Sequence, residues 1–253
     1  MKNTQTVSPN KRRNLILTII AMLAVIAVLF FLEKNSAQHN YAISIIERSL
    51  IYAVVAVSMN LLTGFTGLFS LGQAGFMAIG AYTVAILTIP VEVRPNVYYI
   101  NGISDAIANL QLPFPAALIL GGIFAAAVAA LIGIPVLRLK SDYLAIATLG
   151  FSEIIRALIS SPQMDRITNG SYGLKNIPKF GSIFTPTIIA AICIGIMVLL
   201  INSSYGRAFK AIRENDIAAE AMGINLFKHK EMSFVISSFF TGIAGGLLAV
   251  YMR

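Results

Sequence analysis

The chain has 253 residues, of which 57% are hydrophobic and 12% charged, and its mean hydropathy is +0.79. This composition is too apolar for an ordinary soluble domain, and the apolar residues come in long blocks, which is typical of a chain that spans a membrane repeatedly. The net charge of +8 would suit a nucleic-acid partner, but the basic residues cluster beside the apolar blocks, as topology signals do. We therefore expect a lipid bilayer, and no nucleic acid, around this protein.

The N-terminal part predicts two membrane spans. Residues 1–14 are polar and basic, and an apolar run of about one span's length follows over 15–32. A cleaved signal peptide is the alternative, but the run is long and no small-residue cleavage site follows it. We predict an uncleaved first span with residues 1–14 in the cytoplasm. The second span is predicted over about 43–62, with Glu47 and Arg48 near its outer end, able to pair or to reach water.

The next stretch, residues 60–87, combines glycines with polar side chains. Small residues recur every three to five positions, which lets helix backbones approach closely in lipid. The part from Gly64 to Gly72 is too rich in glycine for a regular helix, so we expect the chain to unwind there. Two interpretations stay open, namely tight helix packing and the wall of a polar substrate pathway. The candidate pathway residues are Asn60, Thr63, Ser70, Gln73 and Gly75.

The middle of the chain predicts an outer break over 90–115, a span over 116–137 and a fifth span over 141–160. Glu153 and Arg156 lie three residues apart in this fifth span, so they share a helix face and can form an ion pair. Ionisable residues within a span usually face the protein interior or an interface, which makes this a candidate interior pair. The alternative is a position near water, because both residues lie in the outer half of the span.

The remaining apolar blocks complete the predicted fold. Glycines and asparagines between 168 and 178 predict turns within an outer loop over 161–185. The sixth and seventh spans are predicted over about 186–201 and 232–251. No domain boundary is visible, so residues 1–253 are predicted to be one all-α, polytopic transmembrane domain with about seven membrane helices.

One long polar segment, residues 203–230, is both basic and helix-forming. Its small and apolar residues have a roughly helical spacing. Asn215 can cap a short helix that begins at Asp216, whose carboxylate suits the positive helix N-terminus. Gly223 can end that helix in the left-handed conformation. We therefore predict a helical arm, a break at Asn215 and a short, rigid, capped helix.

Counting Lys and Arg gives the orientation of this segment. With the N-terminus inside and seven spans, the inner segments hold the majority of the 19 basic residues, close to the ends of the spans. These residues are Lys2, Lys11, Arg12, Arg13, Arg138, Lys140, Arg207, Lys210, Arg213, Lys228 and Lys230. Residues 203–230 are accordingly predicted to be a cytoplasmic loop.

The same segment carries a family resemblance. Ala218-Ala219 followed by Gly223 resembles the cytoplasmic coupling loop of ABC-transporter permeases, although Ile217 stands where that family has Glu, with Asp216 beside it. The strings GRAFKAIRENDIAAEAMGIN, SLGQAGFMAIGAY and SDYLAIATLGFSEIIR are similar to permeases of the branched-chain amino-acid (LivH/LivM) type. The resemblance implies that an ATPase subunit grips this loop. The residues expected to form or support the contact are Gly206, Arg207, Arg213, Asp216, Ala218, Ala219, Glu220 and Gly223.

The resemblance also implies the location, the partners and the substrate of the protein. It implies a permease subunit in the cell membrane, paired with a homologous permease, fed by an extracytoplasmic binding protein and importing leucine, isoleucine or valine. Family members carry further spans, so the chain is expected to be cut short after Arg253. The alternatives are a permease for urea or a short amide, a passive channel or gradient-driven carrier, and a membrane scaffold that transports nothing.

The sequence offers no candidate for catalysis or for a cofactor. It contains neither a nucleophile-elbow motif, nor a zinc-protease motif, nor a phosphate-binding loop. Cys193 is the single cysteine and lies in an apolar block, while His39 and His229 are isolated from each other. We therefore expect no metal site, no catalytic residue and no cofactor bound by this chain, with ATP used by a partner.

Overall fold

The computed structural model describes residues 20, 24–99, 102–139 and 141–253, and over these residues the chain is helical between its turns and loops, without a strand. The main helices are α2 (Ser36–Asn60), α3 (Gln73–Thr88), α6 (Phe114–Val136), α7 (Ser141–Ile159), α9 (Phe184–Asn202), α10 (Ser204–Glu214), α11 (Asp216–Ala221) and α12 (Leu226–Met252). The connections contain α4 (Arg94–Val97), α5 (Asp105–Ala108), α8 (Asp165–Thr168) and single 3-10 turns at Val91–Val93, Pro162–Met164 and Gly170–Tyr172. The predicted all-α fold is confirmed.

The helices have the length and composition of membrane spans. Among the described residues, four unbroken helices qualify, and six segments qualify if each of two bent helix pairs counts as one span. The four are Gln38–Phe65, Phe114–Val136, Phe184–Asn202 and Leu226–Met252. The bent pairs are Gln73–Thr88 with Val91–Val97, at 96°, and Tyr143–Ile159 with Pro162–Thr168, at 57°. They correspond in order to the six spans predicted from residue 43 onwards, so the protein is a multi-pass membrane protein.

Of the first predicted span, 15–32, residues 15–19 and 21–23 lie outside the described residues, and the predicted cytoplasmic segment 1–14 lies outside them entirely. Residues 24–34 are helical, and the chain turns at Asn35 before α2 begins.

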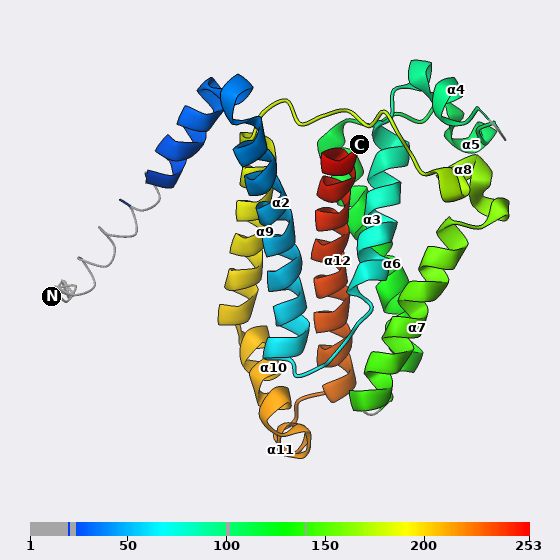
Figure 1. Ribbon diagram of the computed structural model, residues 1–253. Helices are drawn as coiled ribbons and strands as arrows, with labels where there is room; N and C mark the ends of the chain where they lie inside the picture. The colour runs from blue at the N-terminus through cyan, green and yellow to red at the C-terminus, as the bar shows by residue number, and fades with distance from the viewer. Residues whose placement is uncertain (1–19, 21–23, 100–101, 140) are drawn as a thin grey trace, which may run out of the picture.

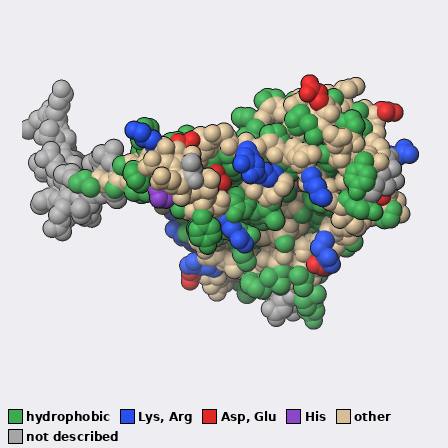
Figure 2. All heavy atoms as spheres, turned by 45° about the horizontal axis from the view of Figure 1, so that its top comes forward, with side chains coloured by type: hydrophobic (Ala, Val, Ile, Leu, Met, Phe, Trp, Pro, Cys, Tyr) green, Lys and Arg blue, Asp and Glu red, His purple; other side chains and the backbone are tan. Residues whose placement is uncertain are grey.

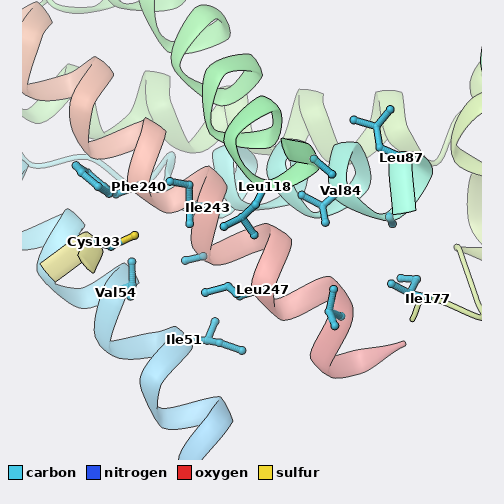
Figure 3. Close-up of a cluster of buried hydrophobic side chains, with 14 of the residues drawn as sticks. Ile51, Val54, Val84, Leu87, Leu118, Ile177, Cys193, Phe240, Ile243 and Leu247 are labelled. Atoms are coloured by element: carbon cyan, nitrogen blue, oxygen red, sulfur yellow. The ribbon is translucent and has the colours of Figure 1, made fainter. Parts of the chain in front are cut away.

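Helix α12 forms the centre of the bundle. Of its most apolar window 72% is buried, against 17% to 39% in the other three unbroken spans. Figure 1 shows α12, in red, surrounded by α2, α3 and α6, and these are the helices against which it packs. In the core, Val54 of α2, Val84 of α3 and Leu118 of α6 gather around Ile243 and Leu247 of α12 (Figure 3). Because lipid tails are as apolar as these side chains, close packing and hydrogen bonds must hold the helices together.

Glycines set how closely the helices approach α12. A methyl group added to Gly80 of α3 would lie 2.0 Å from the carbonyl oxygen of Gly242, and one added to Gly245 would lie 2.0 Å from that of Met77. Backbone touches backbone at both places. At Gly80 the structure thus supports the packing interpretation of the small residues in 60–87.

The two ends of the bundle differ in construction. Helices α10 and α11 project at one end, while α4, α5, α8 and the last residues of α12 lie at the other (Figure 1). Between α2 and α3 the chain leaves the regular helix, first as a π-helical turn over Leu61–Phe65 and then as an irregular segment over 66–72. The predicted unwinding is thereby confirmed, and it lies at the end from which α10 and α11 project.

A buried arginine fastens the opposite end. The Arg94 side chain is inaccessible to solvent, and its guanidinium donates to the backbone carbonyls of Ile86, Ile89, Ile107, Ala108 and Leu110. It thereby ties the end of α3 to α5 and to the loop that follows α5. The Tyr98 hydroxyl donates to the Ile167 carbonyl over 2.7 Å, and burial raises the pKa of Tyr98 to about 12, so the hydroxyl keeps this proton even where a solvent-exposed tyrosine ionises.

The close contact at Gly80 predicts a stability effect. Gly80→Ala pushes a methyl group into the Gly242 backbone, so we expect it to lower the free energy of unfolding by about 1–3 kcal/mol, as overpacking does. SDS-induced unfolding in mixed micelles measures this loss. Gly195→Ala on α9, where an added methyl group meets no atom within 4 Å, is the matched control and should leave stability unchanged or slightly higher. Equal stability of both variants would contradict the packing analysis.

Candidate functional site: the helical arm and the buried polar network

The polar segment after α9 folds as the sequence predicts, into α10, a break and the short helix α11, which together we call the arm. The Asn215 side chain accepts a hydrogen bond from the Ala218 amide over 3.0 Å and caps α11. At the other end Gly223 has a φ of +86°, and its amide donates to the Glu220 carbonyl. The Ile224 amide reaches back to Ala219 and completes a Schellman-type stop. The arm is therefore a stiff element.

Two polar contacts attach the arm to the membrane helices. Arg213 of α10 donates to the carbonyl of Gly64 in the π-helical turn over 2.7 Å, and it also pairs with its neighbour Glu214. Asp216, the first residue of α11, forms an ion pair of 2.6 Å with Lys230 of α12. One contact reaches the junction of α2 and α3, and the other reaches the first turn of the central helix. A displacement of the arm would therefore act on three spans.

Beneath these contacts lies a cavity of about 410 Å³. Its polar lining comes from Arg138, Arg213, Asp216, Lys230 and Thr66. Most of the remainder is leucine, from the irregular segment before α3, the connection between α6 and α7, and the start of α7. The arm also packs on the bundle through the buried apolar side chains of Phe209, Ile212 and Ala219, and the cavity lies beside this contact.

The predicted coupling residues divide into a supporting and an exposed set. Gly206 and Ala219 are buried and hold the arm against the protein, whereas Ala218, Gly223 and the charged residues are exposed. The exposed charged residues are Arg207, Arg213, Asp216 and Glu220. Sequence reasoning did not select Ile217 and Met222 as contact residues, although their side chains are 81% and 83% exposed. These two side chains are therefore candidates for a protein-contact surface.

Gln73 belongs to a buried hydrogen-bond network between α2, α3 and α12. Its amide nitrogen donates to the Ser237 hydroxyl over 3.0 Å, and its amide oxygen accepts from the Thr241 hydroxyl over 2.6 Å. Ser237 in turn donates to the Ser58 carbonyl over 2.6 Å, and the hydroxyls of Ser58 and Thr241 lie 2.9 Å apart. All four side chains are buried, and none carries a charge. The network fixes the register of three spans.

The other predicted pathway residues do not converge on one opening with Gln73. Ser70 is buried, and its hydroxyl accepts from the Gly72 amide. Gly75 packs so tightly on α7 that an added methyl group would lie 3.0 Å from the Ser152 backbone. Asn60 is exposed at the end of α2, and the Thr63 hydroxyl is buried without a partner. In this conformation the packing interpretation accounts for Ser70, Gln73 and Gly75.

The predicted interior ion pair forms, but it does not lie in the interior. Arg156 and Glu153 are 2.6 Å apart, yet their side chains are 77% and 56% exposed on α7. The reason is the orientation of α7, which turns Leu144, Thr148 and Ser152 towards the bundle and carries the pair on the opposite side. The predicted placement inside the chain is therefore wrong.

Several residues that shape the site escaped the sequence analysis. Ser237 and Thr241 lie four residues apart in the seventh span, and this helical spacing of hydroxyls was a readable signal. The partnership of Asp216 with Lys230 crosses a turn and could not be read from spacing. No group of three His, Cys, Asp or Glu residues able to hold a metal ion occurs in the part of the chain that the structure describes.

Glycine-packed spans, a neutral buried network and a stiff arm at one end define the class of helical multi-pass membrane proteins. Within this class, residues 41–253 match the family described as branched-chain amino acid transport system, permease component. The chain belongs to this family.

Individual relatives agree with the family assignment. The chain is 34% identical to the high-affinity branched-chain amino acid transport system permease protein LivM of Salmonella typhimurium, over 82% of this chain and 52% of that protein. It is 34% identical to LivM of Escherichia coli, over 79% and 50%, and 28% identical to the guanosine ABC transporter permease protein NupQ of Bacillus subtilis, over 81% and 66%. The chain thus spans about half the length of these LivM proteins. No solved structure matches the chain.

The network predicts a measurable cost for losing one hydroxyl. Thr241→Val keeps the shape of the side chain but leaves the Gln73 amide oxygen without its donor. We therefore expect the free energy of unfolding to fall by about 1–3 kcal/mol. The matched control is Thr83→Val, because the Thr83 hydroxyl donates only to the Ile79 carbonyl of its own helix. SDS-induced unfolding compares the two, and a Thr83→Val variant that loses as much as Thr241→Val would contradict the network's role.

Proposed function

We propose that this chain is the permease subunit of an ATP-driven importer in the cell membrane, with its N-terminus and its arm in the cytoplasm. The observation that carries the proposal is the capped helix α11, which presents Ile217 and Met222 to the solvent on a stiff support. A separate ATPase subunit binds this surface. Family membership supports the same assignment.

The two attachments of the arm describe how force would reach the spans. Movement of α11 pulls on Lys230 through Asp216, and movement of α10 pulls on the Gly64 carbonyl through Arg213. The Gly64 contact lies in a π-helical turn, a segment whose hydrogen bonding rearranges more easily than that of a regular helix. ATP-driven closure of the partner ATPases therefore tilts α2, α3 and α12 together and alternates access to the pathway. ATP is bound and hydrolysed by the partner and not by this chain.

For the substrate we propose leucine, isoleucine or valine, delivered by an extracytoplasmic binding protein to a pair of homologous permease subunits. The names of the LivM relatives support this choice, and the guanosine permease among the relatives makes a nucleoside the alternative to test beside urea. The face opposite the arm carries Lys and Arg side chains scattered among acidic and apolar ones (Figure 2), which gives a docking protein polar contacts without a single basic patch. A gradient-driven carrier would place charges at its centre, whereas the central network is neutral.

If the ATPase docks on α11, substitutions of its exposed apolar residues should abolish the complex of permease and ATPase. We expect the double substitution Ile217→Glu and Met222→Glu to abolish co-purification of the ATPase, because two carboxylates replace the exposed apolar contact. The control is Tyr99→Glu, which introduces one carboxylate at a 69% exposed residue at the opposite end, and it should keep the complex intact. Retention of the ATPase by the double variant would refute the assignment of α11 as the docking helix.

Force transmission predicts a separate effect. Arg213→Gln removes the charge-assisted contact to Gly64 but leaves α11 unchanged, so the ATPase should still bind while ATP-dependent uptake in proteoliposomes falls at least several-fold. Arg166→Gln is the control, since Arg166 is exposed at the opposite end of the bundle and should retain uptake. Full uptake by the Arg213 variant would exclude this route.

The substrate is tested directly by uptake of radiolabelled leucine, urea and guanosine into the same proteoliposomes. Leucine uptake that unlabelled isoleucine and valine compete away is the expected result. Uptake of guanosine or urea alone would overturn the substrate assignment and leave the coupling assignment standing.

A further inference from the structure

Three basic side chains from separate parts of the chain line the cavity beside the arm. Arg138 follows α6, Arg213 belongs to α10 and Lys230 lies early in α12. Asp216 is the one carboxylate among the lining residues that the structure describes, so three positive charges against one negative charge leave a net charge of +2. A concave surface with an excess of one charge concentrates its electric field within the hollow. The cavity therefore attracts an anion.

Packing holds these cations at the cavity, unlike charges scattered over an open surface. The Lys230 side chain is only 17% exposed. Arg213 lies so close to Gly67 that a methyl group added there would be 3.0 Å from the arginine Cγ. The Arg138 guanidinium carbon lies 6.0 Å from the centroid of the Phe227 ring. Because neighbours already restrict all three side chains, a ligand loses less free energy to ordering them.

The three cationic groups have hydrogen-bond donors left for a ligand. An ammonium group has three N–H donors and a guanidinium group has five. Lys230 gives one of its three donors to a carboxylate of the arm, and Arg213 gives three of its five to its neighbours. Two donors therefore remain on each of these side chains. Among the described residues, Arg138 contacts the Phe227 ring, and its N–H groups are available as well.

A phosphate group matches this set of donors. Its oxygens point in several directions, so one phosphate can accept from three cations that approach from different elements. A guanidinium group binds phosphate through two parallel hydrogen bonds, and an ammonium group binds it as a point charge. The cavity volume of about 410 Å³ is many times the roughly 30 Å³ of one water molecule, so a phosphate group enters together with water or with the group that carries it.

Much of the remaining lining is apolar. Leu68, Leu137, Leu139 and Leu144 contribute to it. Leu139 is also 45% exposed, which marks an opening at the connection between α6 and α7. Figure 1 shows α7 at the edge of the bundle, where lipid has access to it. An apolar wall at such an opening suits the glycerol and the first acyl carbons of a phospholipid.

We propose that this cavity binds a phosphate group through Arg138, Arg213 and Lys230. The phosphate group is carried by the headgroup of an anionic lipid or is free in solution, and both sources offer the same oxygens to the same cations. The inference goes beyond the proposed transport function, because this ligand is neither the transported substrate nor the ATP of the partner.

A bound phosphate group fastens the arm at a third place. The arm already contacts the turn after α2 through Arg213, and α12 through the partner of Lys230. Arg138 belongs to the connection between α6 and α7, and among the described residues no hydrogen bond or ion pair joins it to the arm. A phosphate group shared by the three cations supplies this missing link, so an occupied cavity restricts the movement of the arm.

A fluorescent reporter tests lipid binding. The chain contains no tryptophan, so Tyr143→Trp gives a single reporter next to Leu144 of the cavity lining. In phosphatidylcholine bilayers, brominated phosphatidylglycerol should quench this tryptophan at a mole fraction at least tenfold lower than brominated phosphatidylcholine does. Arg138→Gln should remove the difference. Arg207→Gln is the matched control, because this exposed arginine at the same end is not part of the lining, and it should keep the difference.

Inorganic phosphate separates the two sources. If the phosphate group comes from solution, inorganic phosphate should raise the unfolding temperature of the native chain in phosphatidylcholine, but not that of Arg138→Gln. Selective quenching by phosphatidylglycerol without this stabilisation assigns the lipid, and both effects together mean that the cavity accepts either source. Absence of both effects in the native chain, or equal effects in Arg138→Gln, would overturn the proposal.

Hydrogen exchange tests the fastening of the arm. With phosphatidylglycerol or inorganic phosphate present, whichever binds, deuterium uptake across residues 204–221 should slow at least twofold in the native chain and stay unchanged in Arg138→Gln. Unchanged uptake in the native chain would overturn the link between the arm and the connection after α6. None of these measurements needs the ATPase or a transported substrate, so a failure here is distinguishable from a failure of the docking experiment on α11.

Discussion

The structure depends on the backbone contact between α12 and its neighbours. In a membrane, burying aliphatic side chains against one another gains little over leaving them in lipid, so helices associate where their backbones touch and their polar groups are satisfied. Gly80 against Gly242 and Gly245 against Met77 provide the touching backbones. The hydrogen bonds of Gln73 with Ser237 and Thr241 lie in the same region and would be unreachable if the helices stood further apart. The close approach of the helix backbones and the hydrogen bonding of the buried polar side chains therefore depend on each other.

That constraint also explains where the chain can depart from a regular α-helix. A helix ending inside lipid would leave unpaired carbonyls, so an irregular segment needs neighbouring protein to supply donors. The π-helical turn after α2 receives one from the arm, through Arg213 and the Gly64 carbonyl. The same bond that satisfies the membrane segment is the one that connects it to the arm. Stability and mechanical connection are supplied here by one contact.

The two faces of α7, at the edge of the bundle, differ in the side chains that they present. Its inner face is small and polar enough to pack on the start of α3, with Gly75 set against Ser152. Its outer face carries a charged pair that the chain does not enclose.

The sequence by itself determined the spans, the class of protein and the local form of the arm, because each depends on neighbours in the chain. The lengths of the apolar runs match the thickness of the bilayer. Asn215 caps the helix that begins one residue later, and Gly223 ends that helix. Only the tertiary structure decided which faces these elements present. Spacing placed Glu153 and Arg156 on one helix face but could not say that this face points outward, because the rotation of α7 is fixed by its packing on α3. Likewise, whether Gln73 lines a passage or closes a network depends on Ser237 and Thr241, more than 160 positions away in the chain and brought close only by the packing of α3 on α12.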